Sequence, residues 1–145
     1  MNASTPPIPL TTLLADCSRA GVRPLPPDSA NRIAAAATAL GFSCARIDLG
    51  ACADKRALLE QIAKGLDFPD WFGCNWDALA DCLDDLSWRT APGHIVVLER
   101  AGAFREHHRE DFETLLQILR ESATFWAGVH VPLWAFVDLG GSQPA

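Results

Sequence analysis

The sequence predicts an α/β fold with a three-stranded, mainly parallel sheet packed by helices, preceded by an N-terminal extension. Two stretches, HIVVLE (94–99) and PLWAFVDL (132–139), have continuous apolar cores, which is typical of strands buried on both faces of a parallel sheet. A third, SCARIDLG (43–50), alternates polar and apolar residues as a half-covered strand does. Because helical patterns separate these strands, right-handed crossovers and parallel neighbours follow.

Four helices are predicted from apolar residues at helical spacing. They are 28–40 with Asp28 as cap and Gly41 as end, a helix from Asp54 that stops before Pro69, a helix that follows Asn75, and 107–122. The segment 10–25 is predicted to add a short helix and an edge strand.

One compact domain accounts for the 145 residues, of which 49% are hydrophobic and 21% charged. Residues 1–9, with three prolines, are expected to form a flexible arm, and 140–145 a flexible tail. Between them, 10–139 is a single domain, in which 10–42 is an extension and 43–139 the core.

The net charge of −6 and the pI near 5.0 argue against general binding to nucleic acid, which needs clustered Lys and Arg, and favour a basic protein partner. The longest uncharged run, 122–137, is shorter than the roughly 18 apolar residues of a membrane span. The N-terminus lacks the basic and apolar regions of an export signal, so a cytoplasmic location is expected.

No catalytic residue, metal or cofactor is predicted. The five cysteines form no CxxC pair, which favours reduced, mostly buried thiols. An alternative, that the protein is an enzyme or metal binder, depends on HHRED (107–111), where His107 and Asp111 have the spacing of two ligands on one helix. An exposed helix start is the favoured interpretation, since Asp and Glu are stabilising there, and no phosphate-binding loop or dinucleotide motif is present.

The helix after Asn75 is unusual for its charge. Its apolar residues Leu79, Cys82, Leu83 and Leu86 fall on one side, while Asp77, Asp81, Asp84 and Asp85 gather on the opposite, exposed side. From Gly65 to Trp88 there are six Asp and no Lys or Arg, so the local charge equals the net charge of the whole chain. Like charges at i, i+4 cost a few tenths of a kcal/mol. Local stability therefore does not explain the arrangement. Either the helix has a solvated face that is acidic by chance, or the carboxylates are kept together for a cationic partner, which the neighbouring aromatic residues favour.

Aromatic residues stand beside these carboxylates. Trp71 and Phe72 precede Gly73 just before the helix, a composition that resembles interface centres. Among the tryptophans, Trp71 and Trp76 are the candidate contacts. The others are expected to be structural, Trp126 and Trp134 in the core and Trp88 at a helix end.

The motif FPDWFGCNWDALADCL (68–83), the following HIVVLE and the later ETLLQILRES (113–122) resemble the barstar family of intracellular ribonuclease inhibitors. The resemblance covers roughly 43–139. It implies a three-stranded parallel sheet packed by helices. It also implies a monomer that forms a 1:1 complex, in which the acidic helix and its preceding loop plug the active site of a cationic secreted ribonuclease, with no direct contact to nucleic acid. Such an antitoxin-like role protects the cell that makes the enzyme.

By resemblance, Asp81 aligns with the central aspartate that enters the phosphate-binding pocket of the nuclease, and Trp71 with an aromatic residue that packs on its catalytic histidine. The further contacts implied by the resemblance are Gly73, Asn75, Trp76, Asp77 and the peripheral Glu113.

Two positions depart from the family pattern. Ala80 stands where the best-known member carries a large aromatic residue, and Asp84 replaces a small hydroxyl residue. Both belong to the predicted contact surface. An alternative function therefore stays open, in which the acidic face binds another basic protein without inhibiting a nuclease.

Overall fold

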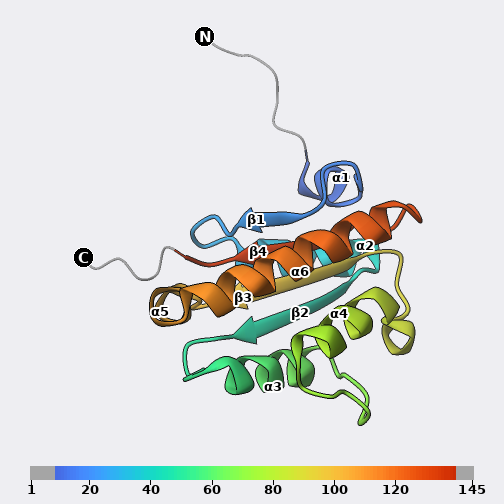
Figure 1. Ribbon diagram of the computed structural model, residues 1–145. Helices are drawn as coiled ribbons and strands as arrows, with labels where there is room; N and C mark the ends of the chain where they lie inside the picture. Colours follow the sequence, from blue (N-terminus) through green and yellow to red (C-terminus); the bar gives the residue numbers. More distant parts are fainter. Residues whose placement is uncertain (1–8, 140–145) are drawn as a thin grey trace.

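The computed structural model describes residues 9–139, whose core is a four-stranded, fully parallel sheet (Figure 1). Its strands are β1 (Val22–Pro24), β2 (Ser43–Asp48), β3 (His94–Glu99) and β4 (Leu133–Val137), in the spatial order β1-β4-β3-β2. The prediction of three strands is wrong by one, because β1 pairs in parallel with β4 at the edge of the sheet. This edge strand falls in the segment 10–25, where a short strand was expected.

Six α-helices and one 3-10 turn complete the described chain. They are α1 (Leu10–Leu14), α2 (Ala30–Leu40), α3 (Lys55–Gly65), α4 (Trp76–Asp85), η1 (Ser87–Arg89), α5 (Gly102–His107) and α6 (Arg109–Ala127). The predicted arm and tail lie outside the described residues, apart from Pro9, whose carbonyl accepts a hydrogen bond from the Leu13 N–H (3.0 Å).

Side chains that alternate along the strands divide the core into two layers. Val96 and Ala135 pack with α3, α4, α5 and α6 on one side, called here the α6 face of the sheet. Ile95, Val97 and Trp134 pack with α1 and α2 on the other side, called here the α2 face. In Figure 1, α6 lies over the sheet and α2 behind it. The sheet is thus covered on both faces, as an all-parallel sheet requires.

Two of the three predicted helix caps are confirmed. The Asp54 and Asn75 side chains accept hydrogen bonds from the Ala57 and Ala78 N–H groups, at 2.9 and 2.8 Å. Asp28 is not a cap: Ser29 holds that position without a side-chain cap, and its hydroxyl donates instead to the Pro26 carbonyl (2.6 Å).

The predicted helix 107–122 is wrong at its start. α5 ends at His107, and His108 leaves helical geometry (φ −136°) before α6 begins. The His108 ring stacks on Phe104, and its Nε2 lies 2.8 Å from the Ala53 carbonyl oxygen. Because this contact spans 55 residues, apolar spacing along the chain carries no sign of it.

The remaining predictions concern membranes and thiols. In the described part of the chain, no helix is long and apolar enough to cross a membrane. All five cysteines are free thiols, but only Cys82 is fully buried. Burial raises the pKa of the thiols of Cys44, Cys52 and Cys82.

Candidate functional site

α4 is held by one buried side. Leu79, Cys82 and Leu83 are almost inaccessible to solvent, and the Asn75 cap fixes where the helix begins. The buried Leu86 ends it in a left-handed conformation (φ 47°), which turns the chain into η1. The opposite side of α4 therefore faces solvent along its length.

Three carboxylates occupy that exposed side at a spacing of four residues: Asp77, Asp81 and Asp85. The ion pairs among residues 9–139 involve other acidic residues, so no cation within the described chain neutralises these three. No ion pair offsets their mutual repulsion, and Asp85 stands at the helix end where the macrodipole disfavours anions. The face is a strip of unpaired negative charge, called here the acidic strip.

Asp84 does not belong to the acidic strip. It was predicted to be exposed with the others, but it is half-buried and accepts a hydrogen bond from the hydroxyl of the buried Ser122 (2.9 Å). Its carboxylate joins α4 to α6. Asp84 leans toward the neighbouring helix because a buried hydroxyl donor is available there.

The loop before α4 carries the most exposed large apolar side chain of the described residues. Trp71 is 61% exposed, and the edge of Trp88 supports its ring at a centroid distance of 6.3 Å. Trp88 is itself anchored, since its Nε1–H donates to the Leu66 carbonyl (3.0 Å) and its ring contacts Phe68 at 5.9 Å. The prediction that Trp88 packs at a helix end is confirmed. The Trp71 ring is exposed but is supported from one side by Trp88.

The remaining loop and helix positions differ in exposure. Gly73 is exposed, and a Cβ there would lie 3.4 Å from Nδ2 of Asn75, so it is not held to glycine by a severe clash. Trp76 is half-buried, with Nζ of Lys55 5.3 Å from its ring centroid. Ala80 is half-buried against the core and contributes little surface of its own.

Glu113 is not brought together with the acidic strip. Ser122 marks the side of α6 that meets α4, and Glu113 precedes it by nine residues, which is half a turn around the helix and about 13 Å along it. Glu121, exposed and adjacent to Ser122, lies nearer to α4 but was not among the predicted contacts. In the sequence, Glu121 could have been recognised as an exposed residue because it does not fall on the apolar side of the predicted helix.

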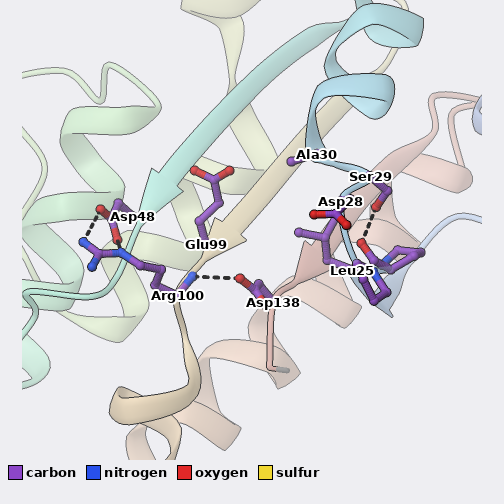
Figure 2. Close-up of a pocket in the computed structure, with 10 residues that line it drawn as sticks. Leu25, Asp28, Ser29, Ala30, Asp48, Glu99, Arg100 and Asp138 are labelled. Atoms are coloured by element: carbon purple, nitrogen blue, oxygen red, sulfur yellow. Dashed lines mark hydrogen bonds and ion pairs between the residues drawn. The ribbon is translucent and has the colours of Figure 1, made fainter. Parts of the chain in front are cut away.

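A second group of carboxylates lies at the carboxyl ends of the strands, where ligands commonly bind in α/β sheets. The cavity there has a volume of about 340 Å³. In it Arg100 binds Asp48 through two nitrogens, at 2.6 and 2.9 Å (Figure 2). Arg100 lowers the pKa of Asp48. The backbone N–H of Arg100 also donates to Asp138 (3.4 Å), and Glu99 pairs with Arg46 (2.6 Å). These acidic groups are engaged within the chain.

The metal-binding alternative depended on the spacing of His107 and Asp111. Across 9–139, no group of three or more His, Cys, Asp or Glu side chains is arranged to hold a metal ion. His107 and Asp111 no longer share a helix, so the spacing that suggested two adjacent ligands does not have that geometry.

The acidic strip and the aromatic loop lie inside a recognised family match. The model of the Barstar family, described as barnase inhibitor, matches residues 42–138. The chain belongs to the barstar family. Members of this family are inhibitors that bind ribonuclease partners. No curated protein matches the chain. α1, β1 and α2 all precede the matched residues, so the cover of the α2 face and the edge strand come from outside the family match.

Proposed function

We propose that this protein is a cytoplasmic, stoichiometric inhibitor of a cationic secreted ribonuclease or a related toxin. The acidic strip and the Trp71 loop would cover the active site of the enzyme in a 1:1 complex. The observation that carries the proposal is the acidic strip itself, with its unpaired carboxylates on a helix whose other side is locked into the core. A site that binds RNA phosphates offers the complementary charge.

The arrangement supports both fast encounter and slow release. A negative strip facing a positive cleft steers diffusion and raises the association rate. Once bound, a carboxylate that is desolvated and hydrogen-bonded to cations slows dissociation. Asp81 is central because it lies midway along the acidic strip, one turn from Asp77 and one from Asp85.

Trp71 supplies the apolar part of the proposed contact. Its braced, exposed ring loses little conformational freedom when covered, since Trp88 already limits its movement. The proposed surface also includes, on the loop side, Gly73, Asn75 and Trp76. In the middle of the acidic strip, Ala80 has only a methyl group where the best-known family member carries a large aromatic ring.

Calorimetric titration with barnase tests the proposal, with RNA cleavage measured on the same mixtures. One-to-one binding that abolishes cleavage is expected, and Asp81→Ala should weaken it by about 2–5 kcal/mol, the range for one partner of a buried charge pair. Barnase with its inhibitor is a reference case for that generalisation, so the range is not independent of the family.

Glu106→Ala is the matched control. It removes the same charge from an exposed position on α5. α5 adjoins the start of α6, whereas Asp84 contacts α6 near its other end, at Ser122. It should leave affinity nearly unchanged. Equal losses for the two variants would show that net charge, and not the acidic strip, drives binding.

A second function is favoured by the two departures from the family pattern. Asp84 is bonded to Ser122, and position 80 carries no large side chain. The proposed contact surface of this chain therefore differs from the family pattern at both positions. Binding of barnase that depends on Asp81 but leaves RNA cleavage intact would support an acidic module for another basic protein.

A further inference from the structure

Two further exposed apolar side chains remain outside the proposed site. Besides Trp71, the large hydrophobic residues most exposed among 9–139 are Phe125 (47%) and Val129 (55%). Phe125 lies in the last turn of α6, and Val129 follows the helix end at Ala127 by two residues, in a turn where its N–H donates to the Trp126 carbonyl (3.0 Å). Val129 is thereby held next to the end of α6, four residues after Phe125.

This pair borders α4. The Trp126 Nε1–H donates to the Leu83 carbonyl (2.8 Å), and one turn earlier Ser122 donates to Asp84. The Phe125 ring rests edge-on against Trp126, with 5.6 Å between centroids. Phe125 is thus within one helical turn of both contacts that join α6 to the end of α4.

Acidic side chains lie on the α4 side of Phe125. Glu121 precedes it by one turn, Asp84 is bonded to Ser122 three residues before it, and neither α4 nor α6 carries a basic residue in its last turn. The two helix ends also turn the negative ends of their dipoles toward this region. An apolar centre with a polar, charged rim is the usual composition of a protein interface.

We propose that Phe125 and Val129 form an apolar anchor at the edge of the surface that binds the cationic ribonuclease. The occupant would be an apolar patch of that enzyme beside its phosphate-binding cleft. The inference rests on the proposed function and is argued from continuity with the acidic strip and from charge: a cationic partner can approach this rim, whereas an acidic one is repelled. The anchor selects among cationic nucleases, because charge alone attracts all of them.

Titration of barnase into Phe125→Ala, Val129→Ala and Asp81→Ala tests the anchor, at low and at high salt. Phe125→Ala should lose about tenfold in affinity, equivalent to about 1.4 kcal/mol, and Val129→Ala a smaller part of that. Both losses should persist in high salt, since apolar burial is not screened, while the loss caused by Asp81→Ala shrinks.

Thr124→Ala is the matched control, because Thr124 is exposed on the same turn and its hydroxyl bonds only to the Arg120 carbonyl of its own helix. Thermal unfolding of each variant verifies the fold. Unchanged affinity in both anchor variants, with dependence on Asp81 retained, would overturn the anchor and leave the proposed inhibition standing. Absence of any binding that depends on Asp81 would overturn the inhibition and the anchor together.

Discussion

The two faces of the sheet are covered by helices from different parts of the chain. The α6 face is covered by α3 to α6, all within the family match, and the outer side of α4 bears the candidate site. The α2 face is covered by α1 and α2, which precede the match and contribute no candidate site residue. The helices on the α6 face thus carry the candidate site, whereas those on the α2 face only complete the core.

The α2 face needs its cover for a physical reason. Its strand residues are large and apolar, with the Trp134 and Phe136 rings stacked at 5.4 Å and the Trp134 Nε1–H bonded to the Leu14 carbonyl (2.9 Å). Without α1, that N–H loses its protein acceptor, and without α2 the rings face water. A patch of this kind favours aggregation.

The largest expected effect is therefore on folding, upon deletion of residues 1–41. The shortened chain should lose cooperative unfolding and aggregate, because Ile95, Val97, Trp134 and Phe136 become exposed. Size-exclusion chromatography and Trp fluorescence during chemical denaturation measure this. A monomeric fragment with a sharp unfolding transition would mean that the α6 face suffices and that the proposed division of the two layers is wrong.

An intermediate effect is expected from pH on the α6 face. His94 is buried at the start of β3, its Nδ1 2.8 Å from the Ser43 hydroxyl oxygen, and burial, with a smaller effect of nearby Arg89, lowers its pKa from 6.5 to about 4. Below pH 6.5 the unfolded chain takes up this proton and the folded chain does not. The free energy of unfolding should thus fall by about 3 kcal/mol between pH 6.5 and 4.

Urea denaturation across that pH range measures the slope. In His94→Asn the slope should largely disappear, whatever the stability of the variant at neutral pH. Asp48 and Asp16, whose pKa values are lowered from 3.8, act at lower pH and do not account for it. A slope that persists in the variant would assign the effect to other groups.

The smallest of the three effects concerns the start of α4. Asn75→Ala removes the bond to the Ala78 N–H and should cost about 1 kcal/mol of stability. Affinity for barnase should fall as well, because Asn75 both caps the helix that carries the acidic strip and belongs to the proposed contact surface. The comparison is with Asp54→Ala, which removes the equivalent cap of α3, also on the α6 face but outside the candidate site. A similar affinity loss in both variants would show that general destabilisation is the cause.

The sequence predicted best what local chemistry determines. The bounds of β3 and the caps at Asp54 and Asn75 follow from short-range patterns, and the structure has them as predicted. β1 is three residues long, includes Pro24 and pairs with a strand more than 100 residues away. The sequence predicted only an additional edge strand somewhere in 10–25. The count of three strands rested on the longer apolar runs, and β1 is not one of them.

The candidate site shows the same limit. That Asp81 is exposed follows from helical spacing, whereas the inward turn of Asp84 depends on Ser122, 38 residues later. The distance of Glu113 from α4 likewise depends on how two helices cross, which spacing within one helix does not describe.

The pairing of β1 with β4 also bears on how the chain is made. Val22 to Pro24 emerge from the ribosome more than 100 residues before their partners, Ala135 to Val137. Until then β1 has no strand to join, and the apolar sides of α1 and α2 lack Trp134 and Phe136. The nascent chain thus holds an unfinished core while the residues between β1 and β4 are made, and the α2 face can be completed only after β4 has emerged.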